Sequence, residues 1–244
     1  MREHRPPLSP AEGYSRVADV YDTWHWRNFW RRNETPRVER ILHRAAASRS
    51  LCILDIGCGT AELTARLRER GHDMFGVDIS SRMVDVARSK LGKDRVWVAS
   101  AQSLPFKSAS FDFLVACRVF SHVRRLAKAL NELRRVAREG AILVVTDVHP
   151  SHRYKHTRVS GEWGEVTIHT IKHAPDKVTA IAASLGWTLV AEDVLTATSA
   201  SWLPMEDERF QSIDRTGIRP VCYILVLRAT GGSRASQVRG RSPP

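Results

Sequence analysis

Short apolar runs alternate with segments of helical periodicity along most of the chain. An apolar run between turn-forming residues is typical of a buried strand, whereas apolar residues spaced three and four apart are typical of a helix. Seven strands are expected on this basis, at 51–56, 73–79, 95–100, 111–120, 141–148, 187–195 and 221–229. Helices are expected at 61–70, 81–91, 124–138 and 175–186. This alternation predicts an α/β fold in which helices cover both faces of a parallel sheet.

The predicted strands and helices use nearly the whole body of the chain, which favours a single domain over residues 11–230. Two segments are added to the alternating pattern, a helical N-terminal segment at about 11–48 and an insert at about 149–173. Residues 1–10 and 231–244 are rich in Pro, Ser, Gly and Arg. We therefore expect a flexible N-terminus and a disordered, basic C-terminal tail.

Composition favours a globular protein in a reducing compartment. Of the 244 residues, 43% are apolar and 26% are charged, so wholesale disorder is not expected. No apolar run approaches the ~18 residues of a membrane span, and the first ten residues lack the apolar stretch of a secretory signal. The four cysteines form no C-x-x-C pair, which argues against a disulfide framework or a zinc site. A cytoplasmic location is expected.

The formal net charge of +12 raises the question of an anionic partner. The densest basic stretch is the predicted helix 124–138, which places its Arg and Lys residues on one half and its apolar residues on the other. A solvated basic face explains this pattern. Contact with RNA is the alternative, and the sequence leaves it open.

The strongest candidate site is the turn after the first predicted strand. That strand ends in Gly57-Cys58-Gly59 and a helix follows at once, so a ligand can approach the backbone closely. Asp78 ends the next strand, where a carboxylate can accept hydrogen bonds from the hydroxyls of a ribose. Asp55 is placed to attract an ammonium group. Glu62 replaces the last glycine of a dinucleotide fingerprint, which argues against an NAD-dependent dehydrogenase.

The motifs "LDIGCGTAEL" (54–63) and "GVDIS" (76–80) resemble the first two motifs of class I S-adenosylmethionine-dependent methyltransferases, and the small-molecule, UbiE-like group (methyltransferase type 11) in particular. The segments 100–123 and 129–150 resemble the later motifs of the same family. The resemblance covers about residues 11–230. It implies a Rossmann-like, doubly wound sheet of seven strands, mostly parallel with an antiparallel last strand, and S-adenosylmethionine as the cofactor.

The resemblance also implies roles for individual residues. Gly57 and Gly59 would line the methionine part of the cofactor together with Asp55, and Asp78 would bind the ribose. Further cofactor contacts are expected from residues that follow three of the strands: Cys58, Ile79, Ser100, Ala101, Gln102, Cys117 and Arg118.

Three positions depart from the family pattern. Ala61 stands where a third glycine is frequent, and Ser100 stands where an aspartate often accepts from the adenine amino group. This change implies either weaker cofactor binding or a substitute contact from Gln102. Glu139-Gly140-Ala141 replaces a Pro-Gly-Gly turn, a change that matters little for the chemistry.

Methyl transfer needs neither a catalytic triad nor a metal, and the sequence indicates no metal cluster. The acceptor pocket is expected above the carboxyl ends of the strands, under the helical lid and the insert. Its candidate lining residues are aromatic: Tyr14, Tyr21, Trp26, Trp30 and Tyr154. His122 is the first candidate for a general base, and His149 and His173 are the second.

The sequence thus favours a methyltransferase that acts on N, O or C of a small acceptor with aromatic or anionic character. An RNA methyltransferase is one alternative, supported by the basic helix and tails. A non-methylating cyclase or binding protein on the same fold is the other. The oligomeric state and the identity of the acceptor are left undetermined.

Overall fold

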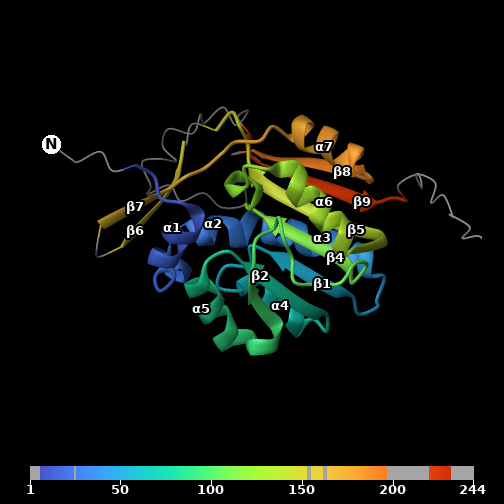
Figure 1. Ribbon diagram of the computed structural model, residues 1–244, viewed down its shortest axis with the longest axis horizontal. Coiled ribbons are helices and arrows are strands. Elements are labelled where there is room, and N and C mark those ends of the chain that lie inside the picture. The colour runs from blue at the N-terminus through green and yellow to red at the C-terminus, as the bar shows by residue number, and fades with distance from the viewer. Residues whose placement is uncertain (1–5, 25, 153–154, 162–163, 197–219, 232–244) are drawn as a thin grey trace, which may run out of the picture.

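The structure is a computed structural model that describes residues 6–24, 26–152, 155–161, 164–196 and 220–231. Its centre is a seven-stranded sheet with the strand order β3-β2-β1-β4-β5-β9-β8 (Figure 1). The strands are β1 (Cys52–Ile56), β2 (Asp73–Asp78), β3 (Val96–Val98), β4 (Phe111–Cys117), β5 (Ala137–Val148), β8 (Trp187–Thr196) and β9 (Pro220–Ala229).

The sheet is parallel except for its last strand in sequence. β1 pairs in parallel with β2 and β4, and the same direction continues to β3 on one side and to β5 on the other. β9 inserts between β5 and β8 and runs antiparallel to both. The expectation of seven strands with an antiparallel last strand is therefore confirmed, and the fold is Rossmann-like.

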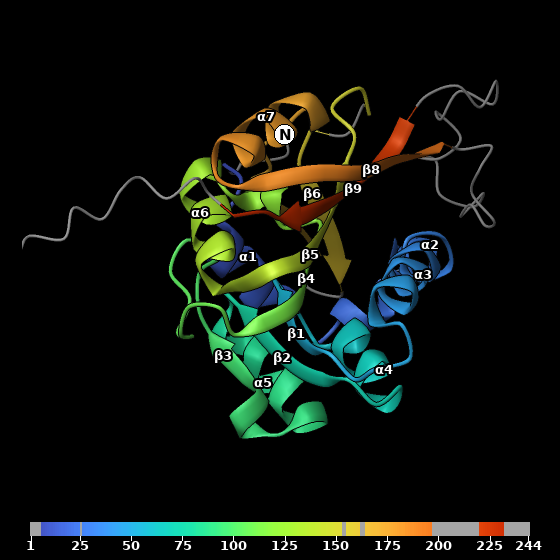
Figure 2. The ribbon, with the colours of Figure 1, turned by 90° about the vertical axis from the view of Figure 1, so that its right-hand side faces the viewer.

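Helices cover both faces of the sheet, as the apolar pattern predicted. One face packs against α6 (Leu126–Val136) and α7 (Pro175–Ser184). The other packs against α2 (Trp26–Asn33), α3 (Thr35–Ala46) and α4 (Glu62–Glu69). Figure 2 shows these two groups of helices on opposite sides of the strands. α5 (Ser81–Leu91) packs beside α4 over β2 and β3.

Successive side chains of the central strands point to opposite faces of the sheet, which explains how both faces are filled. In β1, Leu54 and Ile56 pack on the side of α6, whereas Ile53 packs on the side of α3. Each of these side chains is at most 1% exposed. A strand that is buried on both faces reads as a continuous apolar run, which is why this segment stands out in the sequence.

The N-terminal segment and the insert meet on one side of the sheet. α1 (Pro10–Val17) begins with a capping box, in which Ser9 and Glu12 satisfy each other's backbone amides. The insert forms a hairpin of β6 (Thr157–Gly161) and β7 (Gly164–Ile168) beside α1 (Figure 1). Both strands lie within the insert expected at about 149–173.

Three short 3-10 helices complete the described elements: η1 (Tyr21–Thr23), η2 (Lys93–Arg95) and η3 (Phe120–His122). β4 ends at Cys117 and β5 begins at Ala137, so the boundaries of both strands differ from those expected. Glu139-Gly140-Ala141 lies within β5 and not in a turn before it. Among the described helices, none has the length and apolar character that a bilayer crossing requires.

Candidate active site

A cavity of about 660 Å³ opens at the carboxyl ends of β1, β2 and β4. Its other walls come from α1, α2, η3 and the segment that leads into β6. In open α/β sheets this end of the strands is where ligands bind. All eleven residues expected to contact the cofactor line this one cavity: Asp55, Gly57, Cys58, Gly59, Asp78, Ile79, Ser100, Ala101, Gln102, Cys117 and Arg118.

The turn after β1 has the backbone conformation for which glycine is suited. Gly57 and Gly59 have φ of +66° and +56°. A Cβ on Gly57 would lie 2.5 Å from Cγ2 of Val119, so a larger residue there would displace the segment after β4. Ala61 also has a positive φ of 62°. This explains why a third glycine suits that position, and the alanine bears some backbone strain.

Asp78 closes the floor of the cavity beside this turn. Its carboxylate accepts the backbone N–H of Gly59 at 2.9 Å and that of Ser80 at 2.8 Å. Burial raises the pKa of Asp78 even though these donors favour the charged form. A carboxylate oxygen that accepts one hydrogen bond retains a second lone pair, so both oxygens can still receive a hydroxyl donor.

Asp55 is the second acid of the cavity and is only 3% exposed. The hydroxyl of Thr64 donates to its carboxylate at 2.7 Å. Burial, with a smaller contribution from the negative charge of Asp78, raises the pKa of Asp55 to about 7. The acid is therefore balanced between its neutral and charged forms near neutral pH, and a cation placed against it would favour ionisation.

The segment after β3 forms the opposite wall. Ser100 bridges to Ser103, and its hydroxyl accepts the N–H of Gln102 at 3.2 Å. Ile79 is 46% exposed although it is a large apolar residue, and its side chain lines the cavity. An exposed apolar side chain at the mouth of a cavity is suited to contact a flat ligand ring.

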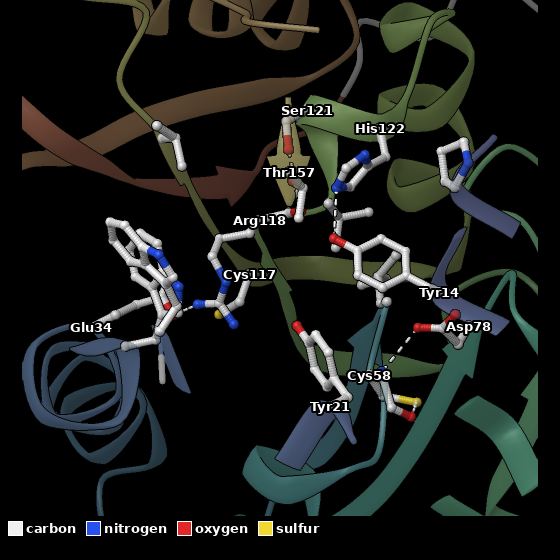
Figure 3. A pocket seen from close by; sticks show the side chains of 18 of the residues that line it. Tyr14, Tyr21, Glu34, Cys58, Asp78, Cys117, Arg118, Ser121, His122 and Thr157 are labelled. Atoms are coloured by element: carbon white, nitrogen blue, oxygen red, sulfur yellow. Dashed lines mark hydrogen bonds and ion pairs between the residues drawn. The ribbon is translucent and has the colours of Figure 1, made fainter. Parts of the chain in front are cut away.

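Arg118 lies across the cavity from Asp78, as Figure 3 shows. It has a positive φ of 60°, which is uncommon for a residue with a side chain. Its guanidinium forms an ion pair with Glu34 and lies 4.7 Å from the centre of the Trp30 ring. Arg118 is therefore held away from Asp78, towards the N-terminal helices.

Glu34 was not identified from the sequence. It is 2% exposed and also accepts a hydrogen bond from the hydroxyl of Thr146 on β5. Buried acids need such partners, because an unpaired charge inside a protein is strongly unfavourable. A glutamate in the polar stretch "RRNETPR" gives no local signal of burial, since its partners come from two distant strands.

The aromatic residues of the N-terminal segment line the cavity as expected. Tyr14 and Tyr21 are in edge-to-face contact, with ring centroids 5.9 Å apart. Trp26 stacks on Trp30 at 6.0 Å. All four residues line the cavity. Tyr154, the fifth candidate, lies outside the described residues.

Of the three histidines predicted as bases, His122 lines the cavity. Its Nε2 is 2.9 Å from the hydroxyl of Tyr14, and its Nδ1 is 2.9 Å from the carbonyl oxygen of His169. Burial lowers the pKa of His122 to about 4, so the ring is neutral near pH 7.

The other two histidines lie away from this wall and do not line the cavity. Nδ1 of His149 is 2.7 Å from the Ser151 hydroxyl, in the turn after β5. His173 is 7% exposed, and its Nε2 is 3.0 Å from the carbonyl oxygen of Val123. In the described part of the chain, no three His, Cys, Asp or Glu side chains gather as metal ligands would.

Arg27, a further charged residue of the cavity, was not identified from the sequence. Arg27 forms an ion pair with Glu62 and lies 4.8 Å from the centre of the Tyr21 ring. The charge of Glu62, which counted against a dinucleotide, is thus neutralised by a residue of α2. Because Arg27 lies far from Glu62 in sequence, no spacing rule connects the two.

Comparisons with known proteins agree with this geometry. A family model described as "Methyltransferase domain" matches residues 54–145, which contain the turn, Asp78 and β4. The chain is 31% identical over 170 residues to a malonyl-[acyl-carrier protein] O-methyltransferase of Erwinia pyrifoliae. It is 34% identical over 149 residues to the ubiquinone/menaquinone biosynthesis C-methyltransferase UbiE of Campylobacter jejuni.

These matches are partial. The first covers 65% of this chain and 63% of the relative, and the second covers 56% and 62%. The chain thus spans less than two thirds of either relative. Among solved structures, the [4+2]-cyclase SpnF is similar over 93% of this chain and 99% of its own, with a TM-score of 0.64 and 19% identity. At that identity the likeness concerns the fold alone.

Proposed function

Because residues 54–145 form a class I S-adenosylmethionine-dependent methyltransferase domain, we propose that this protein transfers a methyl group from S-adenosylmethionine to a small acceptor with aromatic or anionic character. The observation that carries the proposal is the meeting of the Gly57–Gly59 turn, Asp55 and Asp78 in one cavity. The O- and C-methyltransferase relatives support a small acceptor.

The residues present fit this cofactor. Asp78 offers carboxylate lone pairs to the two ribose hydroxyls, and Ile79 and Ala101 offer apolar surface to the adenine. Asp55 provides a negative charge for the ammonium group of the methionine part. The positive φ of both glycines keeps the turn free of side chains where the ligand approaches the backbone.

When bound, S-adenosylmethionine supplies a methyl group on a sulfonium, whose positive charge activates the carbon for in-line displacement. The protein must hold the acceptor in line with that methyl group and exclude water. The N-terminal helices and the insert are proposed to do this within one domain, because both supply walls of the cavity.

The acceptor side of the cavity explains why an aromatic or anionic molecule is favoured. Apart from Asp55 and Asp78, its described charged lining has more cations than acids. The cations are Arg27, Arg31, Arg66, Arg118, Lys155 and Arg158, and the acids are Glu34 and Glu62. The stacked rings of Trp26 and Trp30 offer a flat apolar wall beside these charges.

The proposal is tested by calorimetric titration with S-adenosylhomocysteine. We expect micromolar binding or tighter for the native protein. Asp78→Ala should weaken it by about tenfold or more, because a hydrogen bond to a charged group contributes about 1.5–3 kcal/mol. Asp94→Ala, which removes an exposed carboxylate outside the cavity, is the matched control. Absence of binding to the native protein would refute the proposed cofactor.

A cyclase or binding protein on the same fold is a second candidate, because the cavity would hold the cofactor in either case. It predicts tight cofactor binding without release of S-adenosylhomocysteine across a broad acceptor screen. The RNA alternative is less well supported by the structure. Three arginines of the basic stretch, Arg134, Arg135 and Arg138, donate to groups of the protein itself.

A further inference from the structure

Three segments far apart in sequence meet at one hydrogen-bonded chain in the wall of the cavity. Tyr14 comes from α1, His122 comes from η3, and His169 follows β7. The Tyr14 hydroxyl lies 2.9 Å from Nε2 of His122, and Nδ1 of the same ring lies 2.9 Å from the carbonyl oxygen of His169. Figure 3 shows the Tyr14 hydroxyl pointing at the imidazole ring.

The carbonyl oxygen fixes the direction of both hydrogen bonds. A carbonyl only accepts, so Nδ1 must carry the proton and donate it to His169. In a neutral imidazole, Nε2 is then the acceptor, and the Tyr14 hydroxyl donates to it. His122 therefore directs a basic lone pair at Tyr14, while its other nitrogen is held by the backbone.

Tyr14 also lies next to the cofactor turn. Its ring contacts that of Tyr21, and Tyr21 in turn lies 3.7 Å from the position a Cβ on Gly59 would take. The hydroxyl of Ser15 is 2.9 Å from that of Ser80, which fixes α1 at the end of β2. The Tyr14 hydroxyl thus stands between the cofactor turn and the acceptor side of the cavity.

A proton acceptor at this place matters for some methyl acceptors only. A carboxylate is already ionised at neutral pH and needs no base, whereas a phenol must lose its proton as it attacks. The aromatic walls of Trp26 and Trp30 suit a planar ring. A weakly acidic hydroxyl on an aromatic ring satisfies both features of the cavity.

We propose that the acceptor is a phenol and that Tyr14 and His122 together remove its hydroxyl proton. This inference rests on the proposed function and specifies its acceptor. The acceptor oxygen uses its own electron pair to form the new O–CH₃ bond, while the C–S bond of the sulfonium breaks and its electron pair returns to sulfur. The phenolic proton passes to the Tyr14 oxygen, and the proton of Tyr14 passes to Nε2 of His122. The hydrogen bond from Nδ1–H to His169 favours the resulting imidazolium, whereas burial disfavours it, so the ring soon releases its proton to water.

The first test needs no turnover. In ¹⁵N-histidine NMR spectra of the S-adenosylhomocysteine complex at pH 7, His122 should give the signals of a neutral ring protonated on Nδ1. Tyr14→Phe should shift the Nε2 signal, because the only hydrogen bond described to that atom is lost. Protonation on Nε2, a charged ring, or an unchanged Nε2 signal in Tyr14→Phe would overturn the proposal.

The second test measures methylation of a panel that contains phenol, 4-hydroxybenzoate, 4-nitrophenol, benzoate and aniline. We expect methylation of the phenols on oxygen. At about pH 8.5, Tyr14→Phe and His122→Gln should lower kcat/KM for phenol by about 100-fold, within the usual contribution of a general base. For 4-nitrophenol, which is mostly ionised at that pH, the loss should be less than ~10-fold.

Matched controls are Tyr223→Phe on β9 and His43→Gln on α3, since neither residue lines the cavity. If the cofactor binds but no phenol is methylated, or if both variants affect the two phenols equally, the inference fails while the proposed function stands. If the cofactor itself does not bind, the proposed function fails first. Thermal unfolding of each variant separates these outcomes from misfolding.

Discussion

At the scale of single residues, the site depends on acids whose charges are balanced in different ways. Glu34 is neutralised by Arg118 and accepts a hydrogen bond from Thr146, and Glu62 is neutralised by Arg27. No cation among the described residues pairs with Asp55, and burial holds its pKa at about 7. The charge of Asp55 is therefore available to a cationic ligand.

Because the pKa of Asp55 is about 7, cofactor binding should depend on pH near neutrality. Because the ammonium group of S-adenosylhomocysteine favours the charged form of Asp55, its affinity should rise as pH increases from about 5.5 to 8, with proton release near pH 6.5. Asp55→Asn should bind more weakly and lose most of this dependence. Calorimetry in buffers of different ionisation enthalpy measures the proton release, and equal slopes for both proteins would contradict the assignment.

Asp55 also influences the stability of the fold, and this effect has a pH dependence opposite to that of cofactor binding. Its folded-state pKa of about 7 lies above the unfolded value, so the stabilising contribution of its protonated form is present below pH ~4 and is lost as pH rises through 7. Relative to the native protein, ligand-free Asp55→Asn should therefore become more stable between pH 4 and 7. Chemical unfolding at pH 4 and pH 7 measures the sign of this change in stability. The stability that Asp55 confers should fall as pH rises, whereas the affinity for the ligand should rise.

At the scale of elements, the position of α1 is fixed by its contact with the hairpin. Gly13 of α1 faces Ile168 of β7, and a Cβ on Gly13 would lie 2.5 Å from Cγ1 of that side chain. Leu8 also pairs with Ile168 through the backbone. Helix and hairpin thus form one cover over the cavity, and α1 carries Tyr14 into it.

Gly13→Ala should push α1 away from the hairpin, although alanine is the better helix former. Overpacking costs about 1–3 kcal/mol, which exceeds the gain of up to ~1 kcal/mol in helix propensity. We expect a lower Tm and weaker binding of S-adenosylhomocysteine. Adding Ile168→Ala should relieve the clash, so the double variant should be no less stable than Ile168→Ala alone. Gly231→Ala, whose Cβ meets only ordinary contacts, is the control.

The elements themselves were largely predictable, because each leaves a local pattern. The continuous apolar run of β1 and the Pro175 start of α7 gave the correct element at the correct place. The place of the Gly57–Gly59 turn, Asp55 and Asp78 in one cavity was also predictable, because these residues lie at or just after the carboxyl ends of strands. Boundaries were less accurate where a bulge between Phe111 and Phe113 shifts the pairing of β4 with β5.

The acceptor side was less predictable, for a physical reason. Tyr14 and His122 are separated by 108 positions, and their contact depends on how α1 and η3 are brought together in space. The ion pair between Glu34 and Arg118 depends in the same way on the position of α2 and α3 against β4. No local periodicity encodes such pairs, so His122 could be suggested as a base but its partners could not.

At the scale of the whole molecule, the cavity exists only when the sheet, the N-terminal helices and the hairpin are assembled. A ligand that binds there stabilises the native state alone. S-adenosylhomocysteine at 100 times its Kd should contribute about 2.7 kcal/mol and raise the Tm by about 5–10 °C for a chain of this size. Scanning calorimetry measures the shift, which should be smaller in Asp78→Ala at the same ligand concentration.

The insertion of β9 between β5 and β8 has a consequence for biosynthesis. Until residue 229 has left the ribosome, the outer edge of β5 lacks its neighbour, and β8 cannot join the sheet at all. An apolar strand with an unpaired edge is a template for aggregation. The nascent chain therefore carries an incomplete sheet from the synthesis of β5 until that of β9, and the closing step is a long-range pairing that is slow by nature. Chaperone dependence of this protein should be concentrated in that interval.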